Sequence, residues 1–212
     1  MSDYDPDEAT AREDMCRFLS ACFYEPGPEF AEEDLFGSML IAAGKIHPDL
    51  ANRARALGEA FSSEDVQALL VDYTRLFLGP LQALASPYAS SWLNTAATSG
   101  EPASSAVLEH YRAGGLDLDE EFNDLPDHIA VELEFLYLLT FKRHDAERAG
   151  QTEEQSALAD LECQFLKTHL GAWVTPFASA VKSGAQTAFY RELAELTERF
   201  ICLEQARPGN LH

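Results

Sequence analysis

The stretch DLPDHIAVELEFLYLLTF, residues 124–141, decides the fold of this chain. It opens with residues that start helices: Asp124 is a capping residue, Pro126 is tolerated in a first turn, and Asp127 lies where the helix dipole favours an anion. The apolar side chains that follow leave the helix little polar face. Such a helix is central and buried on most sides, so we expect other elements to pack around it.

The rest of the chain also repeats apolar residues with the period of a helix. This pattern covers segments 15–23, 35–43, 50–61, 66–77, 103–113, 158–169, 173–181 and 190–203. Gly44 is expected to cap one helix at its C-terminus, and Ser62 with Asp65 resembles a capping box. The sequence therefore predicts an all-α, single globular domain of about nine helices over residues 1–212. If that domain divides into subdomains, residues 81–124 are the expected hinge.

Charge is the unusual feature of the composition. The 212 residues include 15 Lys and Arg against 36 Asp and Glu, a formal net charge of −21. Such a surface repels nucleic acid and anionic membranes and favours a basic ligand or peptide, although solubility alone also explains the charge. Met1 to Asp14 carries no signal-peptide pattern, no apolar run is long enough to span a membrane, and the four cysteines are scattered. We expect a cytoplasmic protein.

Motifs for catalysis are missing from the sequence. Phosphate-binding loops and nucleophile elbows are absent, and no His has a carboxylate three residues before it, as di-iron bundles require. His128 and Glu132 are one helical turn apart. They favour an ordinary i, i+4 pair over a shared metal ion. We therefore predict no catalytic residue, no metal and no cofactor.

Aromatic residues gather on either side of the Gly79-Pro80 break. Tyr73, Phe77, Tyr88 and Trp92 would either fill the core and anchor a loop or line a partly exposed groove, because Tyr and Trp are common at binding hot spots. Arg75 lies in the same apolar stretch and needs a carboxylate if it is buried. Asp127 or Glu132 is the expected partner.

Four blocks of these residues resemble the TorD/DmsD/NarJ family of molybdoenzyme maturation chaperones. They are YTRLFLGP at 73–80, PYASSW at 87–92, LPDHIAVELEFL at 125–136 and HLGAWVTPF at 169–177. Each block is weak by itself, but the four occur in family order and spacing. Ala89 and the small residues after it depart from the family pattern, so the shape of the groove and the client are expected to differ.

The resemblance implies a cytoplasmic helical chaperone without catalysis. Such a protein binds the twin-arginine signal peptide and the apoprotein of a molybdopterin oxidoreductase until the cofactor is inserted. Carboxylates of residues 117–127 would pair with the guanidinium groups, and the aromatic groove would take the apolar part of the peptide. The peptide-binding residues expected on this basis are Tyr73, Arg75, Phe77, Pro87, Tyr88, Ser90, Trp92, Asp124, Pro126, Asp127, His128 and Glu132.

Other functions stay open at this point. An accessory, delta-type subunit of a nitrate reductase-like enzyme that is not exported would bind one large partner permanently. A metal-dependent helical enzyme using His128 and Glu132 would bind metal stoichiometrically. The expected partner is a molybdenum-containing catalytic subunit with its leader, without nucleic acid or membrane insertion. The chain itself would be a monomer or a domain-swapped dimer, because the segments 81–101 and 114–124 are long connectors.

Overall fold

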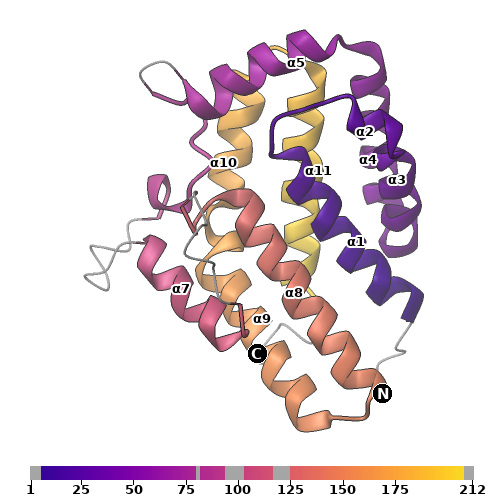
Figure 1. The fold of residues 1–212 in the computed structure, drawn as a ribbon, viewed down its shortest axis with the longest axis vertical. Helices are drawn as coiled ribbons and strands as arrows, with labels where there is room; N and C mark the ends of the chain where they lie inside the picture. The colour runs from indigo at the N-terminus through magenta and orange to yellow at the C-terminus, as the bar shows by residue number, and fades with distance from the viewer. Residues whose placement is uncertain (1–5, 80–81, 94–102, 117–124, 208–212) are drawn as a thin grey trace.

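The structure is a computed structural model that describes residues 6–79, 82–93, 103–116 and 125–207. Within these ranges it contains nine α-helices of eight or more residues and one short one (Figure 1). Their bounds are α1 Pro6–Cys22, α2 Glu29–Glu32, α3 Leu35–Ile46, α4 Pro48–Ser63, α5 Val66–Tyr73, α7 Ala103–Ala113, α8 Ile129–Arg148, α9 Thr152–Thr168, α10 Leu170–Gly184 and α11 Ala188–Gln205. A π-helix at Thr74–Leu78 and a 3₁₀ turn at Ala89–Ser91 complete them. The predicted all-α class is confirmed.

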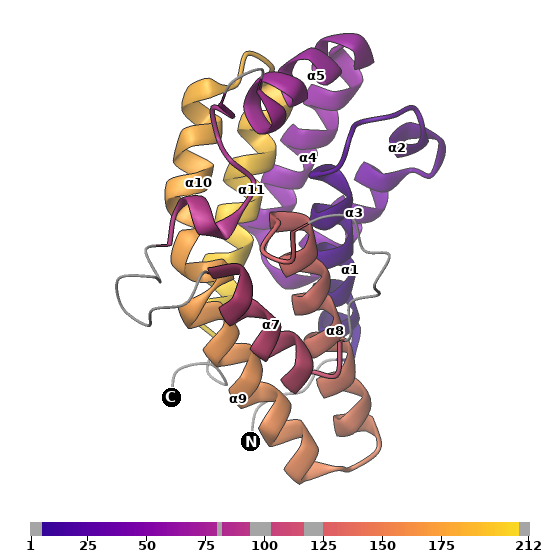
Figure 2. The same ribbon diagram turned by 60° about the vertical axis from the view of Figure 1, so that its left-hand side comes forward.

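Seven helices form a closed ring of neighbours. In order around the ring, α1 packs on α8, then come α9, α10, α11, α4 and α3, and α3 returns to α1. Helix α7 lies outside the ring against α9, and α5 lies at one end of the molecule (Figure 2). No helix in the described ranges is long and apolar enough to cross a membrane.

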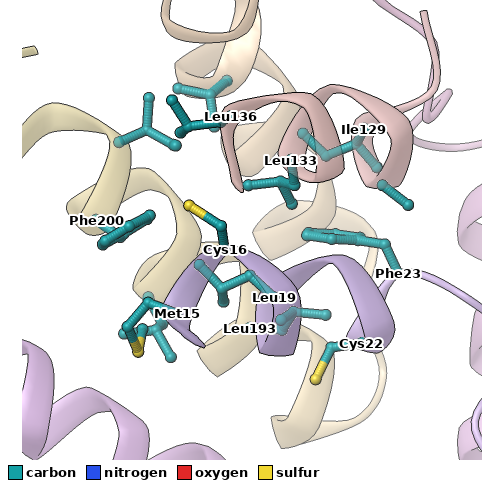
Figure 3. Packing of buried hydrophobic residues seen from close by; sticks show 14 of the residues in the cluster. Met15, Cys16, Leu19, Cys22, Phe23, Ile129, Leu133, Leu136, Leu193 and Phe200 are labelled. Atoms are coloured by element: carbon teal, nitrogen blue, oxygen red, sulfur yellow. The ribbon is translucent and has the colours of Figure 1, made fainter. Parts of the chain in front are cut away.

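The interior of the ring is filled by side chains of helices that are far apart in sequence. Figure 3 shows Leu19 of α1 and Phe23, which directly follows that helix, packed with Leu133 of α8, close to Leu193 and Phe200 of α11. All five are buried, with at most 1% of their surface exposed. Burial of large apolar side chains stabilises a fold by about 1.5–3 kcal/mol each, so contacts between α1, α8 and α11 hold the two halves of the chain together.

Two expected helix ends are wrong, and the structure gives the reason for each. Gly44 does not end its helix, because α3 continues to Ile46 and ends at the extended residue His47, directly before Pro48 starts α4. Ser62 does not open the next helix, because it still belongs to α4. Asp65 is itself the N-cap of α5, and its carboxylate accepts the Gln67 N–H. Asp65, which lies directly before the first turn of α5, therefore caps this helix in place of the expected capping box that begins at Ser62.

The chain turns back after the π-helix at Gly79. Its φ of 56° with ψ of 149° is a conformation that only glycine adopts readily. A Cβ there would also lie 2.4 Å from the Gln82 carbonyl oxygen. The turn brings residues 84 and 85 back beside the π-helix, where Ala85 donates to the Leu76 carbonyl at 2.8 Å.

Asp72 fastens this region to the turn between α10 and α11. One oxygen of its buried carboxylate accepts the N–H groups of Gln186 and Thr187 and the Thr187 hydroxyl, at 2.8–2.9 Å. The other oxygen pairs with Arg75 at 2.6 Å. Only 2% of the Asp72 side chain is exposed, against 34% for Arg75. Asp72 therefore has a larger structural role than Arg75, the cation that pairs with it.

We predict that Asp72→Ala lowers the free energy of unfolding by about 3 kcal/mol, because it leaves three donors without their acceptor. Arg75→Ala is the matched control and should cost less than about 1 kcal/mol, since partly exposed ion pairs contribute little. Urea unfolding of both variants measures the difference. Equal losses would show that the ion pair, not the triple acceptor, secures the turn.

Candidate functional site

The site is built around the first turn of α8. The helix begins at Ile129, and its N-cap is His128, whose ring Nδ1 accepts the Ala130 N–H at 3.2 Å. The expected start at Asp124 to Asp127 is therefore too early: Asp127 precedes the cap, Pro126 lies in the preceding turn, and Asp124 is outside the described residues. A ring nitrogen that accepts a hydrogen bond carries no proton, so this cap requires His128 with its proton on Nε2.

A short segment of the long central loop pairs with this helix start. Ala89 donates to the Asp127 carbonyl at 2.9 Å, and Ile129 donates to the Pro87 carbonyl at 2.8 Å. The Asp127 carboxylate accepts the Ser90 N–H at 2.8 Å. The first N–H groups of a helix lack partners within it. Residues 87–90 thus supply an acceptor to α8 and are held in place by it.

Three rings from three separate parts of the chain meet at the start of α8. The rings of Tyr24, which follows α1, and His128 are stacked, with centroids 6.1 Å apart. The Tyr88 ring meets the same imidazole edge-on at 5.2 Å. The hydroxyl of Tyr24 donates to Glu134 at 3.1 Å. We call Tyr24, Tyr88, His128 and Glu134 the aromatic junction.

Two members of the aromatic junction, Tyr24 and Glu134, are not predicted as site residues from the sequence. Tyr24 is 39% exposed and Glu134 is also exposed, whereas His128 is 5% exposed. The only local signal for Tyr24 is its position, an aromatic residue directly before Glu25-Pro26-Gly27, where a helix must end. Nothing local connects it with Glu134, because the two residues are 110 positions apart.

Two carboxyl groups on either side of His128 in the chain are buried. Asp127 and Glu132 are both 0% exposed. One oxygen of Glu132 accepts the indole N–H of Trp173 at 3.1 Å, while Asp127 Oδ1 and Glu132 Oε1 have no hydrogen-bond partner among the described residues. Burial raises the pKa of Glu132 well above its ordinary 4.5, and the charge of Asp127 adds to this rise against the indole hydrogen bond.

The remaining predicted residues lie outside this group. The Arg75 guanidinium pairs with Asp72, so the expected pairing with Asp127 or Glu132 is wrong. Phe77 is buried in the core, and Tyr73 packs on it with centroids 5.4 Å apart. Trp92 is half-buried and shares a neighbour with Phe77, because both rings contact Phe177, at 6.3 and 6.2 Å. Thus Pro87, Tyr88 and Ser90 contact the start of α8, whereas Trp92 packs with Phe77 on Phe177.

The expected i, i+4 pairing of His128 with Glu132 is not made. The His128 ring accepts the Ala130 N–H as a helix cap, and the Glu132 carboxyl group accepts the indole N–H of Trp173. Within the described ranges, no three His, Cys, Asp or Glu side chains gather closely enough to hold a metal ion.

Comparison with known families gives this geometry a context. Residues 43–179 match the family model described as nitrate reductase delta subunit, a span that contains all four sequence blocks. The chain belongs to this family. The match includes the π-helix, residues 87–90, the start of α8 and Trp173.

Relatives extend the likeness over most of the chain. The chaperone protein TorD of Vibrio cholerae is 26% identical over 210 residues, covering 92% of each chain. TorD of Photobacterium profundum is 30% identical over 167 residues, 75% of this chain and 74% of its own. A perchlorate reductase assembly chaperone protein of Dechloromonas aromatica is 34% identical over 91 residues, 43% of this chain and 40% of its own. The expectation of a chaperone and not an enzyme is confirmed by these relatives.

A solved structure agrees with the fold. The crystal structure described as that of a redox enzyme maturation protein from Archaeoglobus fulgidus superposes with a TM-score of 0.51. It is 23% identical and covers 89% of this chain and 92% of its own. The likeness shows that the same helical architecture has been observed experimentally.

We predict that Glu132→Gln stabilises the protein increasingly as pH rises. Below pH 4.5 the glutamate is protonated in both the folded and the unfolded chain, so it adds no pH dependence. Above that pH the unfolded chain loses the proton and the folded chain keeps it, so the stability of the wild type falls. Urea unfolding at pH 5 and pH 8 should show a larger advantage of the glutamine variant at pH 8. An advantage that is the same at both values would mean that folded Glu132 ionises normally.

Proposed function

We propose that this chain is a cytoplasmic maturation chaperone that binds the twin-arginine leader and the apoprotein of a molybdopterin oxidoreductase. Membership of the family and the TorD relatives support the class of client. The observation that carries the proposal is the aromatic junction, where exposed aromatic surface and a carboxylate lie side by side. A twin-arginine leader offers the complementary pair of features, guanidinium groups followed by an apolar stretch.

The aromatic junction suits both parts of such a leader. The exposed carboxylate of Glu134 can pair with a guanidinium, as carboxylates do in bidentate geometry. Leu125, which is 52% exposed just before α8, and the faces of Tyr24 and Tyr88 offer apolar surface to the segment that follows. Tyrosine is well suited to this role because its ring is apolar while its hydroxyl remains hydrated or hydrogen-bonded.

The burial of Asp127 changes the role that we assign to it. Its fully buried carboxylate accepts the Ser90 N–H, so it does not face an incoming guanidinium in this conformation. We assign to Asp127 the positioning of residues 87–90, and with them Tyr88. Direct pairing with the leader falls to carboxylates that reach the surface.

The first test is a calorimetric titration of the full chain with twin-arginine leader peptides from molybdoenzymes encoded nearby. The matched control is the same peptide with both arginines replaced by lysine, which keeps the charge and loses the planar fork. We expect saturable binding that weakens about tenfold with lysine and weakens further with salt. Absence of binding to every leader would contradict leader recognition. Tight binding to a leaderless catalytic subunit alone would instead indicate an accessory subunit.

A second prediction separates positioning by Asp127 from direct pairing. Asp127→Asn keeps an oxygen that can accept the Ser90 N–H, whereas Asp127→Ala removes it. We expect the asparagine variant to retain leader affinity within about threefold and the alanine variant to lose about tenfold or more. Titrations at low and high salt measure both. If asparagine loses as much as alanine, and mostly at low salt, Asp127 binds the guanidinium directly.

A further inference from the structure

A second surface of the molecule has the form of a binding groove. It lies between α2, α3 and the C-terminal half of α4 and encloses about 780 Å³, which is within the ~300–1,000 Å³ typical of ligand sites. Three phenylalanine rings form its floor. Phe36 lies 4.7 Å from Phe61 and 6.2 Å from Phe30, measured between ring centroids.

The floor of the groove is rigid because it continues into the core. Phe36 and Phe61 both contact Phe189 of α11, with centroids 6.0 and 5.7 Å away. Gly58 lets α3 and α4 approach closely, since a Cβ there would lie 3.1 Å from Cβ of Phe36. Phe36 itself is only half-buried. A preformed apolar surface of this kind binds with little ordering cost.

The edge of the groove is acidic. Asp34 and Glu59 line it. Glu29 and Glu32 of the neighbouring helix α2 and Glu33 directly after it add three more carboxylates, all of them exposed. None of these five carboxylates forms an ion pair with another described residue. Arg55 is the cation in the lining, and it donates to Asn52. The groove therefore presents an apolar floor beside uncompensated negative charge.

We propose that this groove binds a segment of the client enzyme outside its leader: an amphipathic helix with apolar anchors and lysine or arginine on its flank. Helices seat in such grooves through anchors spaced i, i+3, i+4 and i+7, and the acidic edge selects basic flanks. The proposal rests on the chaperone function proposed above, and it assigns a second surface to the same client. In both views of the ribbon, α2–α4 lie on a different side from α7 and the turn at Ala89–Ser91 (Figures 1 and 2).

The probe is a synthetic helical peptide with leucine at i, i+3, i+4 and i+7 and lysine on its flanks, titrated into the full chain. A version with glutamate in place of lysine is the charge control. Two variants alter exposed positions of the groove: Ser62→Trp fills it, and Glu59→Lys reverses its edge.

The matched controls lie elsewhere on exposed helix positions. Ser183→Trp replaces a serine whose hydroxyl bonds to the carbonyl four residues back, as that of Ser62 does. Asp160→Lys makes the same change of charge on α9. Melting temperatures of all four variants, compared with wild type, show whether they are folded.

We expect the lysine peptide to bind wild type and both controls with the same affinity. Its affinity for Ser62→Trp and Glu59→Lys should be about tenfold or more lower. The glutamate peptide should not bind. Equal affinity for all variants, or no binding to wild type, overturns the groove proposal. Self-association of the chain that both groove variants abolish would assign the groove to a second copy and also overturn it. Twin-arginine leader peptides are titrated into the same variants. Their failure to bind wild type contradicts the leader function itself, whatever the lysine peptide does.

Discussion

A helix that begins inside a protein needs acceptors for its first N–H groups, and this requirement organises the molecule around α8. The first turn of this helix is buried from Ile129 to Glu132, so its N–H groups cannot bond to water. The Pro87 carbonyl and the His128 ring supply acceptors. Asp127 then holds the supplying segment in place. Residues 87–90 are therefore fixed by the same bonds that complete the helix.

The sequence predicts the helices of this fold well because their apolar periodicity is a local property. It predicts contacts poorly where a local and a distant partner compete. For Arg75 the local partner wins: it pairs with Asp72, three residues away, whereas the expected partners Asp127 and Glu132 accept from Ser90 and Trp173. Asp127 is the reverse case, because a segment 37 residues earlier covers it. Its place in the sequence is that of an exposed helix-start residue, and only the tertiary structure shows its burial.

The candidate site is likewise predicted only in part from the sequence. The family blocks mark Tyr88, Asp127 and His128, which the fold does bring together. The same blocks also contain residues that the structure uses for support, such as Phe77 in the core and Gly79 in the reverse turn. Tyr24 has no block, although it stacks directly on His128. Residues that support the site from the core and residues that form its surface thus occur in the same sequence blocks. Their burial in the structure distinguishes the two groups.

The closed ring of seven helices has a consequence for the time course of folding. Helix α11 is the last ring helix in chain order, yet it lies between α10 and α4, and α1 has its largest interface with α8. During synthesis, α1 and α3–α4 emerge long before the helices that cover their inner faces. The nascent chain must keep those faces exposed until α11 is available, because contacts between distant segments form late. The inner faces of the N-terminal helices are thus covered only after α11, residues 188–205, has been made.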